Sequence, residues 1–212
     1  MLTYILFDND GILVDTEKYY FQASQEVLQT VGLTLTPELF NEVSLNRGVG
    51  VWEAFPGELS TNQIDSLRDI RDQKYRSLLA TEPLMVDGVD EILRELSSRY
   101  HLAIITTALR EDFETIHART GLLSYFDFYL TNGDYAHSKP APDPYLAGIK
   151  KIGRNAEEGV VVEDTLRGVR AAKAAGLRVI AIPNSFNKQD DFSEADYQLE
   201  SIKELPALIK TL

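Results

Sequence analysis

Hydrophobic residues form short runs along the chain, and these runs are separated by longer stretches in which polar and apolar residues mix. Several runs are nearly continuous in apolar or β-branched residues, which is typical of strands covered on both faces. The predicted strands are LTYILF (2–7), LAIIT (102–106), FDFYLT (126–131), GVVVE (159–163), RVIAIP (178–183) and the weaker DYQLE (196–200).

Helical patterns lie between most of these runs, for example DEILRELSSRY (90–100) and TLRGVRAAKAAG (165–176). Asp143 is expected to be the N-cap of another helix, because Pro144 suits the first helical position and Gly153 suits the end. This alternation of strands and helices predicts parallel βαβ units. The expected fold class is therefore α/β, with a Rossmann-like parallel sheet.

Residues 16–80 interrupt the alternation. They contain helical patterns, such as YYFQASQEVLQTV (19–31) and NQIDSLRDIRDQKYRSLLA (62–80), but no clear strand. We therefore expect a core domain made of residues 1–15 and 81–212, with a small helical cap domain at 16–80 inserted after the first strand.

Composition narrows the possible functions. The chain has 212 residues, no cysteine and a formal net charge of −12. Disulfides and thiolate chemistry are excluded, and the negative charge disfavours nucleic acid and anionic membranes as partners. No apolar run is long enough to span a membrane, and the N-terminal run is too short for a signal peptide. We therefore expect a cytoplasmic protein.

Polar side chains follow four of the predicted strands. In open α/β sheets, ligands bind beyond the C-terminal ends of the strands, so these side chains are expected at one edge. They are Asp8 and Asp10 after the first strand, Thr106 and Thr107 at the end of the second, Ser138-Lys139-Pro140 a short loop after the third, and Glu163 and Asp164 at the end of the fourth.

This combination of side chains matches the needs of phosphoryl transfer. One carboxylate can attack phosphorus and form an acyl phosphate. A second carboxylate can protonate the leaving oxygen and later deprotonate water. Clustered carboxylates repel one another unless a cation lies among them, and Mg²⁺ prefers oxygen ligands. A lysine and a hydroxyl can bind the remaining phosphoryl oxygens.

Four motifs, in this order, resemble those of the haloacid dehalogenase superfamily. The similarity is to the branch with a helical cap, which includes β-phosphoglucomutase and phosphoglycolate phosphatase-like enzymes. The resemblance extends over almost the whole chain. The motifs are DNDG beginning at Asp8, AIIT ending at Thr106, SKPAPDPY containing Lys139, and EDTLRGVRAAKAAG beginning at Glu163.

The resemblance implies that Asp8 is the nucleophile and Asp10 the general acid/base. The backbone carbonyl of Asp10 would also bind the metal. Haloacid dehalogenases proper usually lack an aspartate at the second position, so Asp10 favours a phosphatase or a phosphomutase. Taken alone, the two acids of DNDG could equally be loop residues around a turn at Gly11.

The resemblance also assigns the other motif residues. Thr106 and Lys139 would bind phosphate, although an isolated lysine is usually a solvated surface residue. Asp164 would bind Mg²⁺, and Glu163 would do so directly or through water. Both acids also suit the N-terminus of the following helix. In several relatives the peptide bond between the equivalents of Lys139 and Pro140 is cis.

Four further residues are candidates for contact with the substrate. Thr107 would take the role of Thr106 if the strand were shifted by one residue. Arg47 lies between the predicted helices of the cap in SLNRGVGVWEAF (44–55), and Arg110 follows the second strand. Both arginines could reach the substrate or remain at the surface. Tyr20 stands where mutases of this branch carry a histidine.

We expect a Mg²⁺-dependent phosphatase that acts as a monomer on a small phosphorylated metabolite. The alternative is a β-phosphoglucomutase-like phosphomutase, which Tyr20 disfavours because a phenol does not replace an imidazole. A third possibility is a non-catalytic binding module with this fold, which would be expected to have lost an acid or the lysine.

Overall fold

The chain forms two compact units in a computed structural model that describes residues 1–212. The first consists of Met1–Asp15 and Met85–Leu212, and the second of Thr16–Leu84. The second unit extends to Leu84, and within it the Tyr19 hydroxyl donates a hydrogen bond of 2.7 Å to the carbonyl of Pro83.

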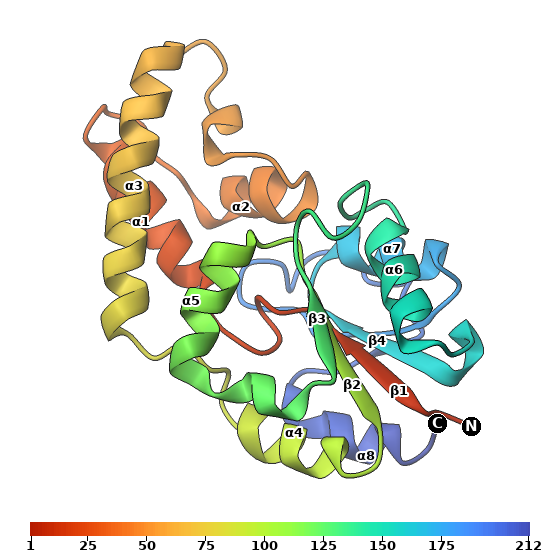
Figure 1. Ribbon diagram of the computed structural model, residues 1–212. Helices are drawn as coiled ribbons and strands as arrows, with labels where there is room; N and C mark the ends of the chain where they lie inside the picture. Colours follow the sequence, from red (N-terminus) through yellow and green to blue (C-terminus); the bar gives the residue numbers. More distant parts are fainter. The chain divides into compact units, whose positions relative to one another are not determined.

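The first unit is built on a six-stranded parallel sheet in the order β3-β2-β1-β4-β5-β6. Figure 1 shows β3, β2, β1 and β4 of this sheet. β1 lies at the centre and pairs with β2 on one side and β4 on the other. The predicted α/β fold class is therefore confirmed. The strands are β1 (Tyr4–Phe7), β2 (His101–Ile105), β3 (Phe128–Leu130), β4 (Gly159–Glu163), β5 (Arg178–Ala181) and β6 (Tyr197–Gln198).

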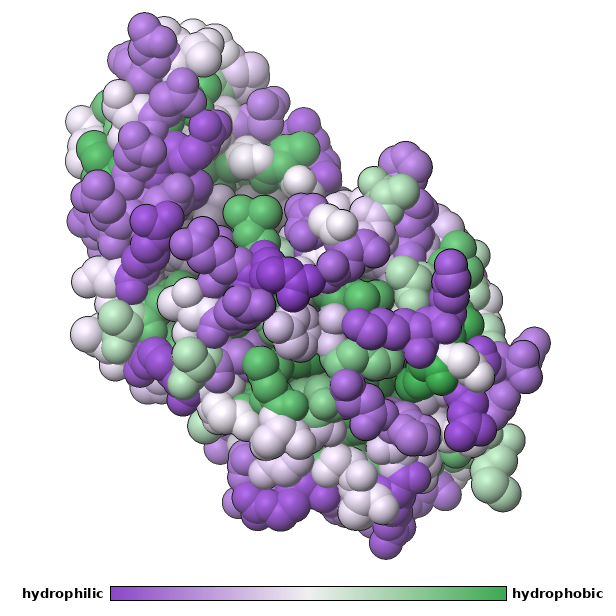
Figure 2. All heavy atoms as spheres, in the orientation of Figure 1, coloured by the Kyte–Doolittle hydropathy of each residue, from purple (hydrophilic) through white to green (hydrophobic).

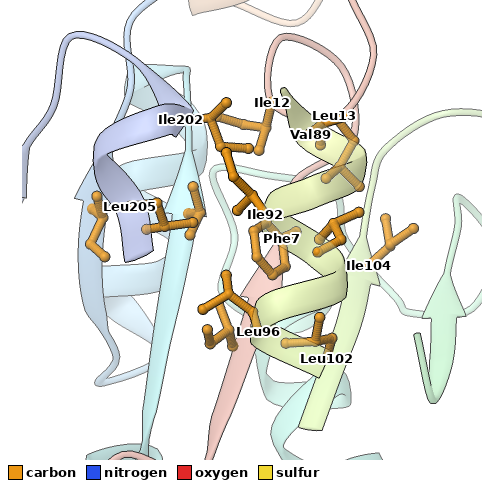
Figure 3. Packing of buried hydrophobic residues seen from close by; sticks show 14 of the residues in the cluster. Phe7, Ile12, Leu13, Val89, Ile92, Leu96, Leu102, Ile104, Ile202 and Leu205 are labelled. Carbon is orange, nitrogen blue, oxygen red and sulfur yellow. The ribbon is translucent and has the colours of Figure 1, made fainter. Parts of the chain in front are cut away.

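Helices cover both faces of this sheet. They are α4 (Val89–Ser97), α5 (Arg110–Thr120), α6 (Asp143–Ile152), α7 (Leu166–Ala174) and α8 (Leu205–Ile209), with short 3₁₀ turns at Leu122–Tyr125, Ala156–Glu158 and Ile202–Glu204. Because successive side chains of a strand point to opposite faces, β1 contributes to two hydrophobic clusters. Ile5 and Phe7 pack in the cluster that includes α4 and α8 (Figure 3), whereas Tyr4 and Leu6 pack in the cluster that includes α6 and α7.

Helix α6 begins differently from the sequence prediction. Asp143 is the first helical residue rather than the N-cap, which is Pro142. The Asp143 carboxylate lies 2.8 Å from His137 Nδ1. Gly153 ends the helix as predicted, in the left-handed conformation with φ of +71°.

The second unit consists of helices and turns only. Its elements are α1 (Glu17–Gln29), α2 (Pro37–Phe40), a π-helical turn at Asn41–Asn46, a 3₁₀ turn at Val51–Ala54 and α3 (Thr61–Thr81). α3 begins with a capping box, in which Ser60 and Gln63 satisfy each other's backbone N–H groups. Trp52 is buried and therefore belongs to the packing of this unit.

Hydrophilic residues cover most of the face shown in Figure 2, and hydrophobic residues appear among them in small groups. The large apolar side chains that remain exposed, such as Leu109 and Leu146, are scattered along the chain. None of the helices combines the length and the apolar character that crossing a membrane would require.

The packing against α4 generates a stability prediction. Leu93 is fully buried in the cluster of Figure 3, so Leu93→Ala should lower the free energy of unfolding by about 2–5 kcal/mol. Leu146→Ala is the matched control, because Leu146 is 48% exposed on α6, and it should change stability by less than about 0.5 kcal/mol. Urea denaturation measures both, and equal losses would contradict the assignment of the core.

Candidate active site

The site begins in the loop after β1. The backbone N–H of Asp8 donates to the carbonyl of Val162 at 2.9 Å, which fixes Asp8 beside β4. The loop then closes on itself, since Gly11 N–H donates to Val14 O and Leu13 N–H to Asn9 O, each at 2.8 Å. The strand order reverses between β1 and β4, so this loop lies at the switch point where α/β sheets bind ligands.

Lys139 lies at the centre of the site and is almost fully buried. Its Nζ donates to Asp8 Oδ1 at 2.7 Å, to Glu163 Oε1 at 2.6 Å and to the carbonyl of Ile105 at 3.0 Å. The Lys139-Pro140 peptide bond is cis, as in the relatives considered above. One ammonium group therefore joins residues that follow or end three different strands.

Glu163 is held by donors on both carboxylate oxygens. Oε1 accepts from Lys139 and from the hydroxyl of Tyr145 at 2.8 Å. Oε2 accepts from the backbone N–H groups of Asp164 and Thr165 at 3.0 and 3.1 Å, and from the Thr165 hydroxyl at 3.1 Å. This set of donors orients Glu163 toward Lys139.

Asp164 is held from the segment that follows β5. Its Oδ2 accepts from Asn184 Nδ2, and its carbonyl accepts from Asn187 Nδ2, both at 2.8 Å. Oxygen atoms of Asp8, Glu163 and Asp164 lie within 4.8 Å of one another, and all three residues are buried. The close approach of Asp8 and Asp164 that the metal assignment required is therefore present.

Burial and charge act differently on the ionisable groups. Burial raises the pKa of Asp8 to about 7, although Lys139 opposes the shift. The pKa of Glu163 is lowered, because Lys139 and its other hydrogen-bond donors outweigh the effect of burial. Burial alone would lower the pKa of Lys139, but the two carboxylates beside it raise it well above its usual value. The lysine therefore stays charged, and Asp8 is the acid whose ionisation depends on further positive charge.

The two threonines after β2 differ in their surroundings. Thr106 is buried, and its Oγ1 accepts from the backbone N–H of Ala108 at 3.1 Å. It directly follows Ile105, whose carbonyl binds Lys139, so it lies beside the buried lysine. Thr107 is partly exposed, and its Oγ1 lies 3.5 Å from Arg167 Nη2.

The remaining candidates are less closely connected to this cluster. Asp10 is partly exposed in the same loop as Asp8. Arg110 binds Asp134 at 2.7 Å and lies over the ring of Tyr129, which supports its role as a surface residue.

In the second unit, Arg47 is exposed, and the Tyr20 hydroxyl accepts a short hydrogen bond from Arg71.

Several polar side chains around the site were not predicted from the sequence, among them Asn184, Tyr145 and His117. Asn184 follows the fifth strand, and the rule used for the first four strands would have found it. Tyr145 lies on α6 and His117 on α5, and His117 Nε2 lies 2.7 Å from Asn9 Oδ1. No local sequence signal marks the two helical residues, because their contacts depend on how the helices pack against the sheet.

Comparison with known proteins identifies the family. The sequence model of the haloacid dehalogenase-like hydrolase family matches residues 5–182. A phosphorylated carbohydrates phosphatase from Thermotoga maritima is 34% identical over 202 residues, covering 90% of each chain. Protein CbbY from Rhodobacter capsulatus is 30% identical over 222 residues, covering 95% of this chain and 98% of CbbY. The chain therefore belongs to the haloacid dehalogenase-like hydrolases.

A solved structure supports the same assignment. The crystal structure of a CbbY mutant from Rhodobacter sphaeroides in complex with xylulose-(1,5)bisphosphate has a TM-score of 0.81 and 27% identity, covering 97% of this chain and 96% of that one. Because relatives within the family are named as phosphatases, the chain is an enzyme of the phosphatase class.

The close approach of Gly11 to Asp164 generates a prediction with a matched control. Gly11 has φ of +77°, and a Cβ there would lie 2.0 Å from Asp164 Oδ2. Gly153 has φ of +71°, but nothing lies within 4 Å of its Cβ position. Both substitutions to alanine should lose about 1–2 kcal/mol through left-handed strain, and only Gly11→Ala should also displace Asp164.

Denaturant unfolding with and without Mg²⁺ separates the two effects. Gly153→Ala should keep any stabilisation by the cation, and Gly11→Ala should lose most of it. Equal behaviour of the two variants would show that the position of Asp164 does not depend on Gly11.

Proposed function

We propose that the protein is a Mg²⁺-dependent phosphatase that hydrolyses a small phosphorylated sugar through an aspartyl-phosphate on Asp8. The observation that carries the proposal is the buried Asp8 carboxylate, which is held by Lys139 at 2.7 Å and lies beside two further buried carboxylates. Asp8 directly follows the central strand β1, is buried, and has the Lys139 ammonium group as its partner. No other ionisable group in the site has these three properties together.

The charges of the cluster favour a divalent cation. Asp8, Glu163 and Asp164 carry three negative charges when ionised, and Lys139 supplies one positive charge. Two negative charges would therefore remain in a buried site, where uncompensated charge is strongly unfavourable. The donors are all oxygen atoms, which suits Mg²⁺.

The hydrogen bonds distinguish the candidate ligands. Both oxygens of Glu163 already accept hydrogen bonds from Lys139, Tyr145 or the backbone after β4. We infer that Asp8 and Asp164 would bind Mg²⁺ together with the backbone carbonyl of Asp10, while Glu163 mainly orients Lys139. When bound, Mg²⁺ would neutralise the carboxylates and withdraw charge from the phosphoryl oxygens.

Each catalytic residue then has a defined task. One oxygen of Asp8 attacks phosphorus, and the bond from phosphorus to the leaving oxygen breaks. Asp10 gives a proton to that oxygen and later takes a proton from the water that hydrolyses the acyl phosphate. Lys139 and the Thr106 hydroxyl would bind phosphoryl oxygens as charge moves between the attacking and leaving atoms.

The names of relatives support the proposed substrate class. One relative is named a phosphorylated carbohydrates phosphatase, and another, from Escherichia coli, is named a fructose-1-phosphate phosphatase. A sugar phosphate offers an alkoxide leaving group, which requires protonation by an acid such as Asp10.

The phosphomutase alternative has less support from the second unit. The Tyr20 side chain is engaged by Arg71, whose guanidinium lies over the Tyr20 ring, and by the ring of Tyr75. This residue therefore has structural partners within its own unit and offers a phenol in place of an imidazole.

The acid/base role predicts different kinetics for two aspartate variants. With p-nitrophenyl phosphate, Asp10→Asn should release about one p-nitrophenolate per enzyme in a burst and then turn over at least about 100-fold more slowly than wild type. This leaving group needs no acid, whereas hydrolysis of the acyl phosphate still needs a base.

Asp8→Asn is the control and should give neither burst nor turnover, because it lacks the nucleophile. Stopped-flow absorbance in the presence of Mg²⁺ measures both phases. A burst from Asp8→Asn would exclude Asp8 as the nucleophile. Wild type that releases phosphate neither from fructose 1-phosphate nor from other hexose and pentose phosphates would contradict the proposed function.

The raised pKa of Asp8 predicts how Mg²⁺ affinity depends on pH. Below its pKa of about 7, Asp8 is protonated and the proton competes with the cation. Affinity should therefore fall by up to about tenfold per pH unit below 7 and level off above it. Calorimetric titration between pH 5.5 and 8.5 measures this dependence, which Asp8→Asn should largely remove. An affinity that does not change with pH in wild type would argue against Asp8 as a ligand.

A further inference from the structure

A buried chain of polar groups connects α5 to the loop that carries Asp8 and Asp10. His117 on α5 is 3% exposed, and Asn9 is fully buried between the two aspartates in sequence. His117 Nε2 lies 2.7 Å from Asn9 Oδ1, and His117 Nδ1 lies 2.9 Å from the Thr120 hydroxyl. At the other end of the chain, Asn9 Nδ2 donates to Asp10 Oδ2 at 3.3 Å.

The hydrogen-bond directions in this chain are determined by chemistry. Burial lowers the pKa of His117 to about 4, so the imidazole is neutral near pH 7 and carries one N–H. The oxygen of the Asn9 amide can only accept, so Nε2 is the protonated nitrogen. Nδ1 then accepts from the Thr120 hydroxyl. The donors run in one direction, from Thr120 through His117 and Asn9 to Asp10.

The Asp10 carboxylate determines the orientation of the Asn9 amide, because an ionised carboxylate can only accept hydrogen bonds and the NH₂ group must therefore face it. With its oxygen bound to His117, Asn9 presents its NH₂ group to the carboxylate of Asp10. A flipped amide would turn its oxygen toward the carboxylate, so that two acceptors would face each other. Leaving such buried groups unsatisfied costs about 1–3 kcal/mol, so the observed orientation is strongly preferred.

The hydrogen-bonded pair of His117 and Asn9 lies beside a hydrophobic cluster, where a polar pair is unexpected. His117 packs against Phe113, with 4.4 Å between ring centroids, and Phe113 belongs to the hydrophobic cluster on this face of the sheet. An apolar pair would fill such a position without any need for matched hydrogen bonds. The polar pair instead extends from the cluster to one oxygen of Asp10.

We propose that His117 is a positioning residue that acts through Asn9 to hold the Asp10 carboxylate in the orientation needed for proton transfer. The proposal rests on the proposed function, in which Asp10 protonates the oxygen that leaves phosphorus. The positioning role concerns only the two proton transfers of Asp10: to the leaving oxygen, and later from the water that hydrolyses the acyl phosphate. The attack by Asp8 is not affected directly.

Two variants of His117 test this role. His117→Phe keeps an aromatic ring but removes the N–H donor, and His117→Gln restores a donor at a similar distance from the backbone. Each is compared on fructose 1-phosphate, whose alkoxide needs an acid, and on p-nitrophenyl phosphate, whose leaving group does not. kcat/KM is the appropriate measure, because it reports the steps through departure of the leaving group.

The proposal predicts a substrate-dependent loss. His117→Phe should lose about 10–100-fold in kcat/KM for fructose 1-phosphate, with a change of less than about threefold for p-nitrophenyl phosphate and little change in KM. His117→Gln should recover most of the loss. Phe113→Leu is the control, because it disturbs the same helix packing without removing a donor, and it should affect both substrates equally.

The outcomes separate this inference from the proposed function. Equal losses on both substrates with His117→Phe, or no loss on either, would overturn the positioning role while leaving the phosphatase assignment intact. Wild type that is inactive on both substrates would count against the proposed function instead. In that case a crystal structure of His117→Phe still tests the inference, which predicts that the Asn9 amide leaves Asp10 Oδ2, and an unchanged contact would overturn it.

Discussion

The site depends on one buried ammonium group. Lys139 Nζ bridges the carboxylates of Asp8 and Glu163 and also binds a backbone carbonyl at the end of β2. Two carboxylates this close in a buried site would repel strongly without it, since charges interact far more strongly there than in water. The lysine compensates only part of the negative charge, because Asp164 adds a third carboxylate. Burial, and after it the charge of Glu163, keep the pKa of Asp8 raised. The incomplete compensation makes the cluster receptive to a cation.

The parallel sheet explains why these groups meet. β1 lies between β2 and β4, so the segments after these strands converge at one edge. Each functional side chain is then braced by a neighbour from another part of the chain. Asn184 binds Asp164, and Tyr145 binds Glu163. The hydrophobic clusters on the two faces fix the strands, and the polar bracing fixes the side chains at their ends, as phosphoryl transfer requires of a preorganised site.

Much of this arrangement could be predicted from the sequence, because it follows from periodicity and strand order. Apolar runs located all six strands. The rule that ligands bind beyond the C-terminal ends of parallel strands grouped Asp8, Lys139 and Asp164.

The contributions of helical side chains could not be predicted in this way. A helical pattern identifies the buried face of α5, but it does not show that His117 is close enough to bind Asn9. The second unit extends to Leu84, and the hydrogen bond of Tyr19 to Pro83 within it leaves no sequence signal.

In the proposed function, Asp8 carries the phosphoryl group during turnover. Borohydride reduces an aspartyl-phosphate to homoserine, so trapping the enzyme during turnover of a sugar phosphate and mapping its peptides by mass spectrometry tests the claim directly. The account predicts homoserine at position 8, dependent on substrate and Mg²⁺, and none at position 10. Modification at Asp10 instead, or turnover without any trapped aspartate, would contradict it.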